Sequence, residues 1–156
     1  AAAIALTIMI LPRTGVLGQV PDQPLTFPHR THAQQLGIQC AFCHRTAASQ
    51  APAGIPSLEQ CMFCHNTVGK GKAGVDALRA AYENGEPLNW LRLHRVPDSV
   101  RFVHEPHIRA GLDCSKCHGE VQSMEQVWAV KSLKMGDCLG CHRERNAPTE
   151  CSICHY

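Results

Sequence analysis

Ten cysteines constrain this chain more than any other feature, because every one of them falls in the same five-residue pattern. The pattern is C-x-x-C-H, and its cysteines are Cys40 and Cys43, Cys61 and Cys64, Cys114 and Cys117, Cys138 and Cys141, and Cys151 and Cys154. A histidine directly follows each pair, namely His44, His65, His118, His142 and His155. Two thiols about one helical turn apart can add to the two vinyl groups of a porphyrin, and the adjacent histidine then becomes the proximal iron ligand. The sequence therefore predicts five covalently bound haem c groups.

Other kinds of cysteine site explain this pattern less well. Zinc ribbons combine two C-x-x-C pairs and need no histidine directly after each one. Iron–sulfur sites use cysteine quartets, and a thioredoxin-like C-x-x-C normally occurs once. Because all five motifs carry the histidine and no cysteine is left over, we interpret them as haem sites.

Five further histidines lie outside the motifs, which is one for each expected iron. They are His29, His32, His94, His104 and His107. Four of them form two H-x-x-H pairs, each preceded by a phenylalanine and followed by an attachment motif. This internal repeat is offset by 75 residues at the histidines and by 74 at the cysteines. Since repeats reveal the structural unit, we predict two related haem-binding modules whose irons take these five histidines as distal ligands.

Methionine is the competing distal ligand, as in cytochromes of higher potential. Met9 lies in the apolar N-terminal segment and Met62 lies inside a motif, so both are poor candidates. Met124 and Met135 fall between the third and fourth motifs. Met135, three residues before Cys138, is the alternative axial ligand, although most methionines simply pack in a core.

The order F-x-H-x-x-H followed by closely spaced C-x-x-C-H motifs resembles the class III cytochromes c of the c7 and c3 type. In that family the first histidine of a pair caps the first haem of its module, and the second caps a neighbouring haem. By position, the resemblance implies the distal and proximal pairs His29–His44, His32–His65, His104–His118, His107–His142 and His94–His155. Pairing across the modules would change this assignment.

A wider resemblance covers nearly the whole chain. Residues 90–107, 114–121, 133–136 and 151–156 are similar to the pentahaem subunit of bacterial alternative complex III, a membrane-bound quinol oxidoreductase. The resemblance implies an electron carrier without catalytic residues of its own. Such a subunit takes electrons from an iron–sulfur subunit and delivers them towards a soluble acceptor, another cytochrome c or a terminal oxidase. The quinol site would belong to another subunit.

Residues 1–11 are apolar and uncharged, and a linker containing Gly and Pro follows over residues 12–24. Eleven residues cannot span a bilayer, which takes roughly 20. The segment is therefore either the end of a membrane helix or part of a signal peptide, and we favour a membrane anchor. Covalent haem attachment takes place outside the bacterial cytoplasmic membrane, so we expect the haem domain on the periplasmic side of that membrane.

The expected fold is mostly irregular, with short helices wrapped around the haems. With 5% aromatic residues, 12 Gly and 10 Pro, the chain would build a poor aliphatic core. Capping-box patterns at 57–60 and 123–126 predict short helices into 61–64 and across 127–133, and residues 75–83 predict an amphipathic helix. No stretch alternates long enough to predict a sheet. We expect a first c7-like module with two haems at 25–70, a helical connector carrying His94 at 71–101, and a second c7-like module with three haems at 102–156.

The predicted function is electron transfer along closely spaced, six-coordinate haems. A multihaem reductase would need at least one five-coordinate iron, and five spare histidines argue against it. A free periplasmic shuttle would carry the same haems without a complex. A zinc-binding structural module would show no Soret band.

Lysines and arginines are dispersed, and no basic run with interleaved aromatic residues occurs, so we expect no nucleic-acid partner.

Overall fold

The computed structural model describes residues 18–156, which form short helices joined by extended segments. In chain order they are the π-helix η1 (Arg30–Gln35), α1 (Cys40–Cys43), α2 (Leu58–His65), α3 (Ala73–Glu83), α4 (His104–Arg109), α5 (Ser115–His118), the 3-10 helix η2 (Val121–Ser123), α6 (Met135–Glu144) and α7 (Cys151–Cys154). The only β pairing among the described residues is an isolated antiparallel bridge between Val100 and His155. The expectation of a mostly irregular fold with short helices is confirmed.

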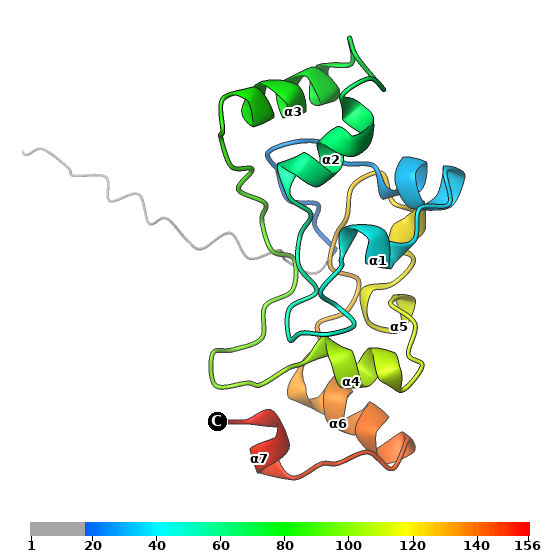
Figure 1. Ribbon diagram of the computed structural model, residues 1–156. Helices are drawn as coiled ribbons and strands as arrows, with labels where there is room; N and C mark the ends of the chain where they lie inside the picture. The colour runs from blue at the N-terminus through cyan, green and yellow to red at the C-terminus, as the bar shows by residue number, and fades with distance from the viewer. Residues whose placement is uncertain (1–17) are drawn as a thin grey trace, which may run out of the picture.

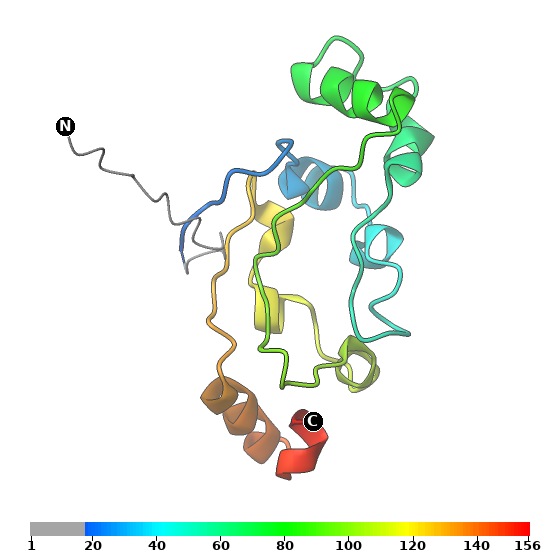
Figure 2. The ribbon, with the colours of Figure 1, turned by 90° about the vertical axis from the view of Figure 1, so that its left-hand side faces the viewer.

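The molecule is elongated, and its helices follow one another along the long axis (Figures 1 and 2). Helices α3 and α2 lie at one end. Helices α1, α5 and α4 occupy the middle, and α6 and α7 lie at the other end together with the C-terminus. The attachment motifs, which α1, α2, α5, α6 and α7 carry, are therefore spread along the length of the molecule.

The apolar core of the described residues is small. Only five hydrophobic residues in residues 18–156 are buried, and no large side chain there is fully buried. They are Met62, Leu78, Ala81, Met124 and Ala129. Large apolar side chains such as Leu36 and Phe63 are 66% exposed. A chain of this size with so little buried apolar surface has little hydrophobic stabilisation of its own, which agrees with the expectation that bound haem fills the interior.

Hydrogen bonds between distant segments hold the two halves of the chain together. The Gln23 side chain pairs with the backbone of Leu91, donating from Nε2 at 3.0 Å and accepting at Oε1 at 2.9 Å. The backbone N–H of Arg101 donates to the carbonyl of Cys154 at 2.7 Å, beside the Val100–His155 bridge. The long connector therefore runs beside both the N-terminal segment and the last attachment motif.

Two of the three predicted helices are confirmed. Helix α3 includes the predicted residues 75–83 and ends at Glu83, with Asn84 as its C-cap. Helix α2 begins after Ser57 as the capping-box pattern predicts, although the Ser57 side chain makes no capping hydrogen bond.

The helix predicted across residues 127–133 is wrong. The chain makes only the single turn η2 and then becomes extended at Met124. The Met124 carbonyl accepts a hydrogen bond from the backbone N–H of Arg30 at 2.9 Å, and the Ala129 carbonyl accepts one from Gly18 at 3.0 Å. These carbonyls are used by distant parts of the chain, so they are not paired within a helix.

No helix within residues 18–156 is long and apolar enough to cross a membrane. The predicted anchor at residues 1–11 and the first part of the linker, residues 12–17, lie outside the described residues.

Candidate haem sites

Each C-x-x-C-H motif is folded as a helical turn, which presents its two cysteines on one face. Helices α1, α5 and α7 are isolated turns of this kind, whereas the second and fourth motifs lie within the longer α2 and α6. In the isolated turns the backbone N–H of the motif histidine donates to the carbonyl of the first cysteine, at 2.9 Å for His44, His118 and His155. Residues three apart on a helical turn share a face. All ten cysteines are free and at least partly accessible, as attachment requires.

The repeat inferred from the sequence has the same local geometry in both copies. The Phe27 ring lies edge-on to His29, with centroids 4.8 Å apart and planes at 84°, and Phe102 lies edge-on to His104 at 4.8 Å and 83°. The second histidine of each pair lies beside the same phenylalanine ring, stacked at 4.4 Å and 20° for Phe27–His32 and tilted at 4.9 Å and 35° for Phe102–His107. The phenylalanine therefore fixes both imidazoles of the pair.

Three pairs of imidazoles, each with one distal and one proximal histidine, lie at the separation that one iron between them would require. Metal–imidazole bonds are about 2 Å long, so two rings on opposite sides of one iron have centroids roughly 6 Å apart. The measured centroid distances are 5.9 Å for His32–His65, 6.3 Å for His104–His118 and 6.0 Å for His107–His142. The residues present therefore fit haem iron at the second, third and fourth motifs, in the pairing that the family resemblance implied.

The hydrogen bonds of the ring nitrogens orient these imidazoles for metal binding. In six histidines Nδ1 lies within hydrogen-bond distance of a backbone carbonyl. The pairs are His32–Pro28 at 2.9 Å, His44–Gly54 at 2.7 Å, His65–Val68 at 3.1 Å, His104–Ala51 at 2.6 Å, His107–Val103 at 2.8 Å and His142–Pro148 at 2.5 Å. A carbonyl only accepts, so Nδ1 donates and the lone pair is left on Nε2. This is how metal-binding histidines are usually held.

His29 and His118 are kept neutral by their surroundings. Burial, together with the smaller effects of His44 and His32, lowers the pKa of His29 to about 4. Burial also lowers the pKa of His118 to about 4, with His94, His104 and His44 adding to the effect. The Nδ1 atom of His29 is buried without a hydrogen-bond partner, so no backbone carbonyl orients this ring as in the six histidines above. A neutral imidazole is the form that binds iron.

The cysteine thiols show which motifs are neighbours in space. Burial raises the pKa of the Cys61 thiol, and the adjacent Cys43 raises it further, so the first and second motifs adjoin. Burial and then Cys40 raise the pKa of Cys114, which joins the first motif to the third. The pKa of Cys138 is raised by burial first, then by Asp137, and then by Cys154 and Cys117. The fourth motif therefore lies next to the fifth and the third. The spatial order of the motifs is therefore second, first, third, fourth and fifth.

His94 occupies a place that the sequence did not reveal. Its ring lies edge-on to His118, with centroids 5.0 Å apart and planes at 71°, which is too close for an iron between the two rings. Burial lowers the pKa of His94. The pairing of His94 with His155 stays a prediction.

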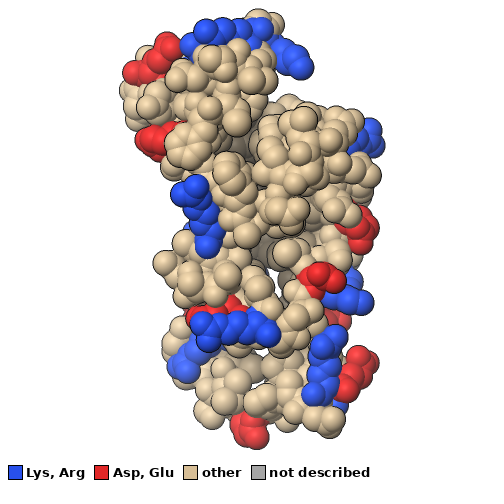
Figure 3. All heavy atoms as spheres, turned by 45° about the vertical axis from the view of Figure 1, so that its right-hand side comes forward, with Lys and Arg blue, Asp and Glu red and all other residues tan. Residues whose placement is uncertain are grey.

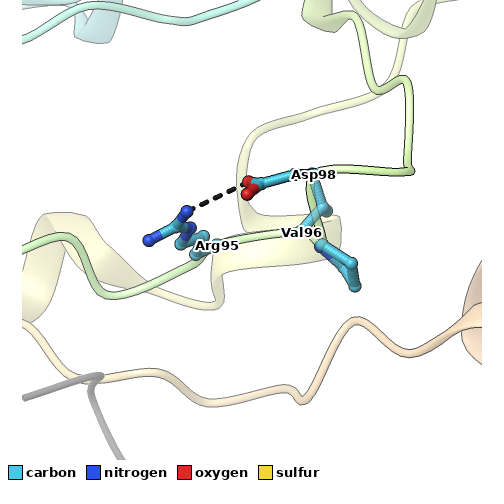
Figure 4. A pocket seen from close by; sticks show the side chains of 4 residues that line it. Arg95, Val96 and Asp98 are labelled. Carbon is cyan, nitrogen blue, oxygen red and sulfur yellow. Dashed lines mark hydrogen bonds and ion pairs between the residues drawn. The ribbon is translucent and has the colours of Figure 1, made fainter. Parts of the chain in front are cut away.

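The segment that follows His94 leads to the last motif. An open hollow of about 320 Å³ is lined by residues 95–98, where the Arg95 guanidinium pairs with the Asp98 carboxylate at 3.0 Å (Figure 4). Val100, two residues further along, forms the backbone bridge to His155. The alternative ligand Met135 is the first residue of α6 and is 62% exposed.

Sequence reasoning missed the carbonyl partners of the ring nitrogens and the side chain of Arg79. The guanidinium of Arg79 donates to the carbonyls of His65 and Asn66 at the end of α2. No sequence signal marks these partners, because every residue carries a backbone carbonyl and because Arg79 lies 14 residues from His65.

Comparison with known proteins agrees with this geometry. Residues 12–95 match the class III cytochrome C family, and residues 100–156 match cytochrome c7 and related cytochrome c. The chain belongs to the class III cytochrome c family. It is also similar to the multihaem cytochrome c subunit of the menaquinone reductase of Nitratidesulfovibrio vulgaris (strain Hildenborough), with 26% identity over 86% of this chain and 77% of that subunit. This class III cytochrome is thus a multihaem protein with covalently bound haem c and a role in electron transfer.

Proposed function

We propose that this cytochrome binds five haem c groups and serves as an electron conduit in a quinone-linked respiratory complex. The observation that carries the proposal is the set of imidazole pairs about 6 Å apart at three motifs. Bound haem iron supplies reversible one-electron transfer. Two paired histidines of the chain would hold each iron, and an iron held by both would have no free position for a substrate.

The proposed ligand set extends the three imidazole pairs that lie about 6 Å apart to all five motifs. We place His29 opposite His44, because after burial His44 is the neighbour that contributes most to lowering the pKa of His29. His94 is the one histidine left for His155, and the segment after it leads to the bridge between Val100 and His155. In this set every iron has two histidine ligands, and Met135 binds none.

The proposed route runs along the long axis of the molecule. The thiol contacts order the motifs as second, first, third, fourth and fifth, and Figures 1 and 2 show the helices that carry them spread from α2 to α7. The His65 and His155 sites are then the two ends of the route. The His104 side chain ties the halves together, because its backbone N–H and Nδ1 both donate to Ala51 in the first half.

The partners we propose are the other subunits of a complex at the bacterial cytoplasmic membrane, with the haem domain on the periplasmic side and residues 1–11 as part of an anchor. The relative is a subunit of a menaquinone reductase, which supports a quinone-linked assembly. The resemblance to the pentahaem subunit of alternative complex III favours electron flow from quinol, through an iron–sulfur subunit, towards a periplasmic acceptor.

Purification of the native chain from membranes tests this function. We expect it to be recovered with partner subunits, and we expect a menaquinol analogue to reduce its haems within the complex. Reduction by quinol gives the direction of alternative complex III, and oxidation of the pre-reduced haems by added menaquinone gives the direction of the relative. Recovery of the chain alone from the periplasmic fraction, with haems that neither quinol nor quinone affects, would contradict the proposal and favour a free shuttle.

A further inference from the structure

The guanidinium of Arg79 is hydrogen-bonded to the backbone of a proximal histidine. It lies on α3, and its Nη1 atom donates to the carbonyl of His65 at 2.9 Å and to the carbonyl of Asn66 at 2.7 Å. These carbonyls lie at the C-terminal end of α2, where carbonyl groups lack helical partners and where a positive charge is favoured. The guanidinium is therefore fixed beside the second haem-attachment site.

The surroundings of Arg79 leave its positive charge largely effective. The side chain is 22% exposed, and its nearest carboxylate is Glu83, at 3.9 Å and itself 66% exposed. Lysine and arginine side chains also gather at this end of the molecule (Figure 3), but Lys70 and Lys72 are exposed, and solvent and salt screen exposed charges strongly. An arginine keeps its charge throughout the accessible pH range.

We propose that Arg79 raises the reduction potential of the haem at His65, at one end of the electron route. Reduction adds one electron to an iron that keeps its two histidine ligands, so the net charge of the site falls by one. A fixed positive charge nearby favours the state with the lower net charge. The inference rests on the proposed function, because it requires haem at His65. Arg79 would act on the haem through its charge and its hold on the His65 backbone, without contact to a substrate.

Substitutions at two positions separate charge from hydrogen bonding. Arg79→Gln removes the charge and keeps a donor, whereas Arg79→Lys keeps the charge but replaces the planar guanidinium with an ammonium group. Glu83→Gln removes the counter-charge. Lys70→Gln is the matched control, because it removes one positive charge from the same end of the molecule at an exposed site.

The measurement is a redox titration of each holoprotein followed by NMR of the haem methyl groups, with the His65 haem assigned from a His32→Met variant. We expect Arg79→Gln to lower the ratio of reduced to oxidised His65 haem about tenfold at a fixed potential, equal to 59 mV for one electron. Arg79→Lys should retain most of the wild-type ratio, Glu83→Gln should raise it, and Lys70→Gln should change it by less than twofold.

Two results would overturn the inference. The first is that Arg79→Gln leaves the reduction potential of the His65 haem unchanged. The second is that Arg79→Lys and Arg79→Gln lower this potential equally, which would assign Arg79 a structural role only. A haem count below five with no haem at His65 would instead contradict the proposed function, so the two failures are distinguishable.

Discussion

At the scale of single residues, two half-buried histidines predict a pH dependence of stability. The pKa of His29 and that of His118 are both lowered to about 4 by burial and neighbouring histidines. An unfolded chain therefore binds protons at these rings near pH 6.5, before the folded chain does. We expect the guanidinium unfolding midpoint of the holoprotein, followed by the low-spin Soret band, to fall progressively as the pH drops from 6.5 towards 4. A midpoint that is constant across this range would contradict the assignment of both rings as imidazoles that stay neutral in the folded protein.

His94 is the residue whose role a single substitution tests best. If it is the distal ligand at His155, His94→Ala leaves one iron with five ligands. We expect the reduced variant to bind carbon monoxide at one haem in five, whereas Arg92→Ala, an exposed neighbour, should bind none. The absence of carbon monoxide binding in His94→Ala would move the ligand role to another residue, with Met135 the first to be substituted.

The residues of the haem sites were predictable to different degrees. The cysteines and proximal histidines follow from the motif alone, since thiol chemistry fixes their spacing. The partners of His32, His104 and His107 followed from a repeat and a family resemblance, and the ring separations agree with them. The place of His94 beside His118 could not be predicted, because it depends on how the connector runs past the third motif.

At the scale of elements, a glycine determines the turn before an attachment motif. Gly111 has φ of 74°, and a Cβ added there would meet nothing within 4 Å. The cost of Gly111→Ala is therefore that of the left-handed backbone alone, about 1 kcal/mol. We expect unfolding of the holoprotein by guanidinium to show this loss, while Gly136→Ala in α6, also open but helical, should be neutral or stabilising. Equal destabilisation by the two substitutions would contradict this assignment.

The elements that the sequence predicted well are those that depend on interactions between residues close together in the chain. The amphipathic pattern of α3 and the turns of the motifs depend on residues a few positions apart, and they form as expected. The prediction of a helix across residues 127–133 was wrong because the carbonyls of Met124 and Ala129 accept hydrogen bonds from Arg30 and Gly18. These partners lie about a hundred residues away, and a capping-box pattern carries no information about them.

For the whole molecule, the small apolar core predicts that folding depends on haem. Five buried hydrophobic residues among the described positions cannot offset the conformational entropy of so long a chain. We expect the haem-free chain, expressed in the cytoplasm without attachment enzymes, to give the circular dichroism spectrum of an unfolded protein. A cooperative thermal transition in this haem-free chain would contradict a fold built on haem.

The proposed conduit depends on five six-coordinate irons, each held between two histidines. Low-temperature EPR of the oxidised holoprotein, with haem quantified per chain, tests this most directly. We predict five haems per chain, all low-spin with the g-values of bis-histidine ligation, and no high-spin signal. One equivalent of high-spin ferric haem, or a count other than five, would contradict it.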